Sequence, residues 1–164
     1  MLTLVSDVRL RLARSRDAPD IAAMSHAFIE RGLRQTWTDA RIARHIRHPE
    51  SVVLVADFLG PLGGFAIMDF GDDTAHLDLL AVAPAHRRRG VGRSLVAWLE
   101  ETAVTAGTFV IGLEVRADNL AARSFYESLG YAEIARVHGY YQGLEDALRM
   151  QRDVRLAGSS TRAR

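Results

Sequence analysis

The chain has 164 residues, of which 48% are hydrophobic and 25% are charged, as is typical of one soluble globular domain. Its formal net charge of +1 argues against a general nucleic-acid-binding protein, and the absence of cysteine excludes disulfides, cysteine nucleophiles and thiolate metal sites. No apolar run reaches the roughly 18 residues of a transmembrane helix, so we expect a cytoplasmic protein without nucleic-acid or membrane partners.

Periodicity in the first half of the chain predicts two helices among three strands. The strands are expected over residues 8–12, 52–58 and 63–70, and the helices from Asp17 to Gly32 and from Thr38 to His48. His45 and His48 share the end of the second helix with no carboxylate at metal-ligand spacing, so no metal site is predicted there.

The second half predicts strands alternating with helices. The strands are expected over residues 76–82, 109–115, 131–137 and 147–154, and the helices over residues 90–106 and from Asn119 to Leu129. Residues 138–143 are predicted to form a loop. Because a helix connects the strands 76–82 and 109–115, we expect these two strands to be parallel.

Four arginines and two glycines lie where a strand leads into a helix, in residues 87–94. The first N–H groups of a helix have no partner within it, glycine lets the backbone approach an anion closely, and arginine adds charged hydrogen bonds. The stretch therefore predicts a phosphate-binding site, although a solvated basic face accounts equally well for the arginines taken alone.

The order of elements predicts an α/β (α+β) fold. A mixed, mostly antiparallel, seven-stranded sheet with helices on both faces is expected, and the crossover helix predicts a splay between neighbouring strands at its centre. Residues 1–156 are interpreted as a single domain, and residues 157–164 as a disordered tail, because they are small, polar and basic.

Two motifs resemble a known family. Arg87-x-x-Gly90-x-Gly92, following LLAVAP, is similar to the acetyl-CoA motif of the GNAT superfamily of N-acetyltransferases. LEVRADNLAARSFYESLGY, residues 113–131, and the Tyr140-Tyr141 pair with Glu145-Asp146-Ala147 resemble the bacterial ribosomal-protein alanine N-acetyltransferases.

The resemblance implies a role for each matching residue, with acetyl-CoA as co-substrate and no metal. Glu114 would be the general base and Tyr126 the general acid. Trp37, Tyr140 and Tyr141 would contact the acceptor. The residues implied to bind CoA are Leu80, Ala81, Val82, Arg87, Arg88, Arg89, Gly90, Val91, Gly92, Arg93, Ser94 and Asn119.

Other interpretations of these residues stay open at the level of sequence. Glu114 could pair with Arg116 or Arg123, and Asp78 is a rival base. Tyr126 could be a packing residue. The chain also departs from its relatives near the acceptor residues, because Thr36 replaces a proline before Trp37 and the segment after Tyr141 is shorter and lacks proline.

The predicted function is transfer of an acetyl group from acetyl-CoA to a primary amine by direct attack, with a protein or peptide N-terminal α-amine as the preferred acceptor. A small-molecule amine or a lysine side chain is the alternative, and a non-catalytic acyl-CoA-binding module ranks below both. The expected partners are acetyl-CoA and an amine acceptor such as a protein N-terminus, and the sequence allows a monomer or a homodimer.

Overall fold

The computed structural model describes residues 8–155, so the predicted disordered tail lies outside the described residues. Contacts between residues divide this part of the chain into two compact units, residues 8–69 with 79–99 and residues 70–78 with 100–155. Strand β4 (Thr74–Val82) and helix α3 (Val91–Thr105) contribute residues to both units. Each unit is described by itself.

The strands follow the hydrogen-bonded order β1-β2-β3-β4-β5-β7-β6. This order confirms the predicted mixed, mostly antiparallel sheet of seven strands with helices. Among residues 8–155, no helix is long and apolar enough to cross a lipid bilayer.

The first unit contains an antiparallel meander with two helices before its second strand. Its elements are β1 (Arg9–Leu12), η1 (Ser15–Asp17), α1 (Ala18–Phe28), α2 (Asp39–Arg47), β2 (Ser51–Asp57) and β3 (Leu62–Phe70). Strand β2 pairs antiparallel with both β1 and β3. The predicted first helix is shorter than expected, because α1 ends at Phe28 and not at Gly32.

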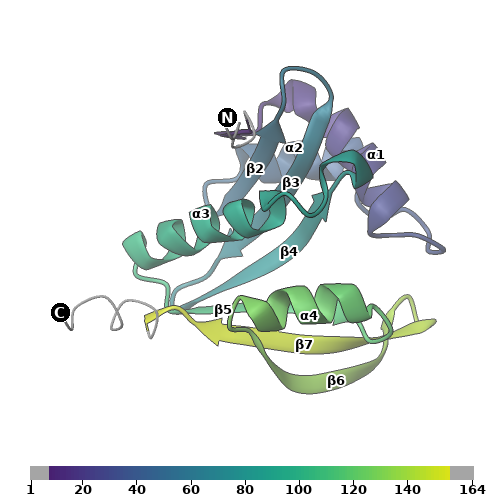
Figure 1. Cartoon of the computed structure of the whole chain (residues 1–164), viewed down its shortest axis with the longest axis vertical. Helices are drawn as coiled ribbons and strands as arrows, with labels where there is room; N and C mark the ends of the chain where they lie inside the picture. The colour runs from purple at the N-terminus through teal and green to yellow at the C-terminus, as the bar shows by residue number, and fades with distance from the viewer. Residues whose placement is uncertain (1–7, 156–164) are drawn as a thin grey trace, which may run out of the picture. The chain divides into compact units, whose positions relative to one another are not determined.

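Helices cover both faces of β3 in this unit (Figure 1). Phe65 belongs to one buried cluster with Ile21 of α1 and Ile42 of α2. The neighbouring Gly64 faces the opposite side, because successive residues of a strand alternate between faces. A Cβ atom at Gly64 would lie 3.5 Å from the Leu95 side chain of α3, which places α3 on this face. It would also lie 2.9 Å from the Ala81 carbonyl oxygen of β4, so this glycine allows the backbone of β4 to approach closely.

The second unit joins the first part of β4 to three further strands and one helix. These elements are β5 (Val110–Arg116), α4 (Leu120–Ser128), β6 (Ala132–Tyr141) and β7 (Glu145–Asp153). Strand β5 pairs antiparallel with β7, which pairs antiparallel with β6. The buried face of β5 carries Leu113 and Val115, and α4 lies over β5 and β7 (Figure 1).

The parallel pairing between β4 and β5 confirms the predicted crossover. It runs from Thr74, opposite Val110, to Leu77, opposite Leu113. Both strands continue beyond these pairs, to Val82 and Arg116.

The predicted loop over residues 138–143 is wrong. Strand β6 extends to Tyr141 and β7 begins at Glu145, so the connection is a tight turn. Gly139 and Gly143 adopt φ values of +63° and +73°, which glycine tolerates without strain. The Asp146 carboxylate accepts the Gly139 N–H at 2.9 Å, which stabilises the irregular register at this hairpin.

A buried carboxylate organises the segment between α1 and α2. Glu30 is 4% exposed, and its two oxygens accept the Thr36 N–H at 2.6 Å and the Trp37 N–H at 3.1 Å. The Thr36 hydroxyl and the Ser25 hydroxyl also donate to this carboxylate. Thr38 then begins α2 by accepting the Arg41 N–H, as the sequence predicts.

We expect Glu30→Gln to lower the free energy of unfolding by about 1–3 kcal/mol, because the amide nitrogen of glutamine would face backbone donors and leave them unpaired. Denaturation by urea, followed by circular dichroism, measures this change. Glu50→Gln is the matched control, since Glu50 is exposed in the same unit, and its effect should stay within about 0.5 kcal/mol. Equal stability of the two variants would contradict the role assigned to Glu30.

Candidate functional site

The Arg/Gly stretch forms the connection between β4 and α3 in the first unit. A single 3-10 turn, η2 (Pro84–His86), follows β4, and α3 begins at Val91. Arg88 and Gly90 adopt left-handed φ values of +61° and +79°. These conformations bring the chain into the first turn of a 15-residue helix, whose leading N–H groups carry partial positive charge.

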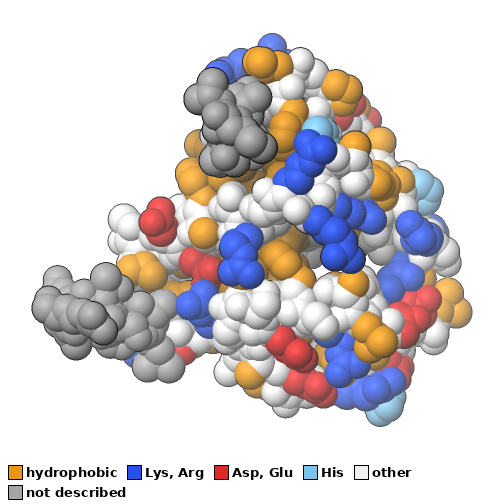
Figure 2. Space-filling view, in the orientation of Figure 1, with side chains coloured by type: hydrophobic (Ala, Val, Ile, Leu, Met, Phe, Trp, Pro, Cys, Tyr) orange, Lys and Arg blue, Asp and Glu red, His pale blue; other side chains and the backbone are white. Residues whose placement is uncertain are grey.

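The arginines of this connection differ in their surroundings. Arg87 folds back onto the protein, where its Nε donates to the Val82 carbonyl oxygen at 2.9 Å and its guanidinium lies 5.4 Å from the centre of the Phe28 ring. Arg88 and Arg89 are exposed. Figure 2 shows basic side chains gathered around the beginning of α3. The connection therefore combines exposed positive charge with helix N–H groups, which suits an anionic phosphate group.

A row of polar side chains crosses three strands of the second unit. His76 lies opposite Gly112 in the parallel pair, and Glu114 lies opposite Arg149 in the antiparallel pair. Residues two apart on a strand share a face, so His76, Asp78, Glu114 and Arg149 project from the same side of the sheet. This is the face opposite to the one that buries Leu113 and Val115.

These four side chains bind one another. His76 lies between two carboxylates, with Nδ1 at 2.5 Å from Asp78 Oδ1 and Nε2 at 2.5 Å from Glu114 Oε2. The other oxygen of Glu114 accepts a hydrogen bond from Arg149 Nε at 3.0 Å. The Glu114 side chain is only 9% exposed, whereas those of His76 and Arg149 are 41% and 43% exposed. Glu114 therefore pairs with His76 and Arg149, and not with Arg116 or Arg123 as the sequence alternatively allowed.

Two opposing effects act on the pKa of Glu114. Burial raises it, but the hydrogen bonds and positive charges of His76 and Arg149 lower it by more, so the pKa lies below its usual value. The hydrogen bonds to Asp78 and Glu114 raise the pKa of His76 to about 10. At neutral pH the row thus holds an imidazolium between two carboxylates, with the Arg149 guanidinium at one end.

Tyr126 is buried within the second unit. Its side chain packs edge-on against Phe125 and Tyr131, with ring centres 5.0 and 5.7 Å apart. Burial raises the pKa of Tyr126, and the nearby Tyr141 adds to the shift. The phenol therefore keeps its proton across the physiological range and can donate a hydrogen bond or a proton.

Asn119 begins α4. Its side-chain oxygen accepts the Ala122 N–H at 3.1 Å, which is the bond of a helix N-cap. The amide NH₂ of Asn119 is not used by this bond, so capping does not conflict with the ligand contact that the resemblance implies.

Tyr140 and Tyr141 lie at the end of β6, beside Glu114. Their rings meet edge-on with centres 4.9 Å apart. Burial and the hydrogen bond and charge of Glu114 raise the pKa of Tyr140, while burial and the neighbouring Tyr140 raise that of Tyr141. The second unit therefore brings together the predicted base Glu114, the two predicted acceptor residues Tyr140 and Tyr141, and His76.

Trp37 lies in the buried core of the first unit. It is 9% exposed and belongs to the same hydrophobic cluster as Ile42 and Phe65. The Arg41 guanidinium stacks on its ring at 3.7 Å, and the His45 ring lies 5.0 Å away. The nearby His45 is half-buried, and its Nδ1 lies 3.2 Å from the Asp69 carboxylate of β3.

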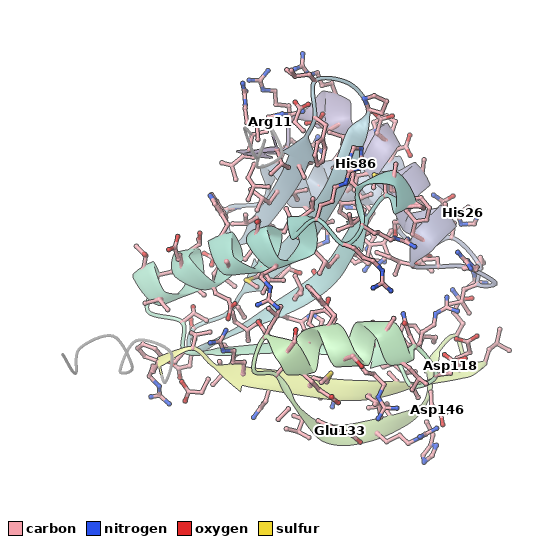
Figure 3. The ribbon with its side chains drawn as sticks, in the orientation of Figure 1. Arg11, His26, His86, Asp118, Glu133 and Asp146 are labelled. Carbon is pink, nitrogen blue, oxygen red and sulfur yellow. The ribbon has the colours of Figure 1, made fainter. Side chains whose placement is uncertain are left out.

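A shallow polar pocket of about 350 Å³ lies near the β6–β7 hairpin. Asp118, which precedes α4, and Asp146 of β7 line it from the same end of the unit (Figure 3). Arg136 also lines the pocket and binds the Asp146 carboxylate at 3.1 Å. Neither Glu114 nor Tyr126 lines this pocket, so it is separate from the polar row.

His76 and Arg149 were not predicted as site residues from the sequence. A local pattern could have indicated them, because each is a titratable residue with an apolar residue on either side of it in a strand. A second polar residue follows two positions later in each case, Asp78 after His76 and Gln151 after Arg149. The predicted parallel pairing of the strands would have placed His76 and Glu114 on adjacent strands. Their exact register, which decides contact, required the structure.

Residues 20–131 of the chain match the acetyltransferase (GNAT) family. This range covers more than half of the chain, which therefore belongs to that family, as its motifs predicted.

Individual relatives agree with the narrower resemblance. The ribosomal protein bS18-alanine N-acetyltransferase of Salmonella typhimurium is 44% identical over 92 residues, which are 54% of this chain and 62% of the relative. The chain thus spans about three fifths of the length of this relative.

Two solved structures share the fold over most of both chains. Ard1 from Thermoplasma volcanium superposes with a TM-score of 0.79 at 27% identity, over 89% of this chain and 97% of Ard1. The ribosomal-protein-S18-alanine N-acetyltransferase of Escherichia coli superposes with a TM-score of 0.75 at 30% identity, over 90% and 94%.

Proposed function

We propose that this protein is an acetyl-CoA-dependent N-acetyltransferase whose acceptor is the α-amine at the N-terminus of a protein or peptide. Residues 1–156 would form a single catalytic domain. The observation that carries the choice of acceptor is the pairing of Glu114 with His76 and Arg149, which keeps this carboxylate ionised and weakly basic. Membership of the acetyltransferase family supports the reaction class.

The connection between β4 and α3 suits the donor. Residues 87–94, with Arg88 and Arg89 exposed, would hold the CoA pyrophosphate through charge and the first N–H groups of α3. The backbone of Leu80, Ala81 and Val82 would pair with the pantetheine arm in the manner of an added strand. Asn119 would contribute the NH₂ group that its capping bond does not use.

Acetyl-CoA would supply the activated acetyl thioester. The acceptor nitrogen attacks in its neutral form and becomes strongly acidic once it has bonded to the acyl carbon. Glu114, which is ionised, would take that proton directly or through water. Tyr126, whose raised pKa keeps its phenol protonated, would donate to the departing sulfur.

The weak basicity of Glu114 favours an α-amine over a lysine. A carboxylate with a lowered pKa is a poor base for a stable ammonium group. With a pKa of about 7.7–8.0, roughly a third of an α-amine is already neutral near pH 7.5, whereas a lysine with a pKa of about 10.4 is neutral in roughly one molecule per thousand. An α-amine therefore needs no strong base before it attacks.

An acceptor panel tests this proposal. Thiol release from acetyl-CoA would be followed with peptides that carry a free N-terminus and no lysine, with N-terminally blocked lysine peptides, and with polyamines. We expect kcat/KM for the free α-amine to exceed that for the blocked lysine peptide by about 300-fold, in line with their neutral fractions. Preference for lysine or polyamine would contradict the proposed acceptor. The chain itself contains no lysine, so acetyl-lysine found in the mixture comes from the substrate.

We expect CoA to raise the melting temperature of the protein, because a ligand that binds the folded state alone stabilises it, by about 2.7 kcal/mol at 100 times its Kd. Gly92→Trp should abolish the shift, since a large side chain in the first turn of α3 would occupy the space in front of its N–H groups. Differential scanning fluorimetry measures the change. Gly60→Trp is the control, because an added Cβ there meets nothing within 4 Å. A wild-type protein that does not respond to millimolar CoA would overturn the donor assignment.

We expect Glu114→Gln to lower kcat for an α-amine peptide by about 100-fold near neutral pH, which is the lower range for loss of a general base, and to leave the CoA-induced melting shift unchanged. Stopped-time thiol release and scanning fluorimetry provide the two readouts. Glu127→Gln, at an exposed position of α4, is the control and should retain wild-type kcat. Unchanged turnover in Glu114→Gln would transfer the role of base to Asp78 or to solvent.

A further inference from the structure

We propose that His76 is a positioning residue for the acetyl-transfer reaction, which orients the Glu114 carboxylate and keeps it charged while Asp78 holds the imidazole ring in place. This inference rests on the proposed function, since it concerns the residue that would serve as the base. It extends that function by assigning roles to two residues on β4.

The imidazole ring of His76 is held in one orientation by its two hydrogen bonds. Both ring nitrogens are engaged, at 2.5 Å from Asp78 and at 2.5 Å from Glu114. Asp78 lies two residues along the same strand, whereas Glu114 comes from the adjacent strand. A ring held at both nitrogens cannot rotate without breaking a charge-assisted bond, so it sets the direction of the Glu114 carboxyl plane.

Glu114 keeps room for an acceptor in spite of these bonds. A carboxylate offers about four lone-pair sites, and His76 and Arg149 occupy one on each oxygen. Tyr140 also lies close enough to bind Glu114. At least one site is left over, so a proton arriving from an acceptor would meet a carboxylate held in place by its partners and not a mobile carboxyl group.

Asp78 holds the ring from its own strand. Its Oδ1 lies 2.5 Å from His76 Nδ1, and its side chain is 13% exposed. Within this unit His76 faces Asp78 and, on β5, Glu114, and Glu114 in turn faces Arg149 on β7 and Tyr140 on β6. Two carboxylates and two cations balance, so replacement of His76 leaves an excess negative charge beside Glu114.

The sign of the expected pH effect follows from this balance. Without the imidazolium, burial and the neighbouring Asp78 charge would act on Glu114 with less opposition, so the pKa of Glu114 would rise. A base with a higher pKa becomes protonated at a higher pH as the solution is acidified. The acid limb of the pH–rate profile would therefore move toward higher pH.

The test compares the kcat profiles of wild type, His76→Leu and His76→Gln between about pH 4 and 9.5 with an α-amine peptide. We expect His76→Leu to shift the acid limb set by Glu114 upward by about one pH unit, so that its rate falls by up to about tenfold relative to wild type at the acid end and by less at high pH. His76→Gln should recover part of the rate at high pH, because its amide can donate to Glu114 without supplying charge. His26→Gln is the matched control, since His26 is exposed in the first unit (Figure 3).

A second readout does not depend on turnover. The ¹⁵N chemical shifts of the imidazole rings, assigned with His76→Gln, should show His76 protonated up to pH 8 or above, beyond the ordinary histidine pKa of about 6.5. Asp78→Asn should lower the pKa of His76. Loss of an equal factor of kcat at every pH in His76→Leu, or titration of His76 near 6.5, would overturn the proposal. If the wild-type protein acetylates no amine, the proposed function is overturned instead. The ring titration would still show whether His76 is protonated at neutral pH.

Discussion

The ion pairs around Glu114 are the interaction on which the candidate catalytic centre depends. A carboxylate that is 9% exposed loses most of its hydration, and an isolated charge in that position would be strongly disfavoured. His76 and Arg149 offset this cost from two neighbouring strands, so the charge of Glu114 requires the pairing of β4, β5 and β7. The ion pairs of the site therefore form only in the observed strand register, because a shift of one residue in any of these strands would turn its polar side chain to the opposite face.

This constraint also limits the chemistry. The usual way to strengthen a carboxylate as a base is to bury it without cations, which raises its pKa. Here the cations act in the opposite direction, and the result is a carboxylate suited to accept a proton from an already acidic nitrogen. Tyr126 has the complementary property, because burial raises its pKa and keeps the phenol protonated. Two groups whose environments shift their pKa values apart can serve as acceptor and donor of protons in the same reaction.

Much of the fold could be predicted from the sequence because its signals are local. The apolar periods, Thr38 and Asn119 as helix caps, and the crossover from β4 through α3 to β5 were all visible as patterns over a few residues. The hairpin of β6 and β7 was predicted less well, since glycine and glutamine at residues 139, 142 and 143 have the composition of a loop but form a bulge and a tight turn. Trp37 shows what the sequence left open. Its position before α2 indicated a contact with the acceptor, which stays a prediction, whereas its burial in the core and the bond from its N–H to Glu30 came only from the structure.

By itself, the sequence determined the family, the order of elements, the basic connection before α3 and the presence of Glu114 and Tyr126 in matching motifs. These features depend only on residue type and on spacing along the chain, and both can be read directly from the sequence. Only the tertiary structure decided which charges meet. His76 and Glu114 are 38 residues apart in sequence and Glu114 and Arg149 are 35 apart, so their contacts arise from the register of strands that pair over long separations. The protonation states follow from those contacts and from burial, which no local pattern of residues specifies.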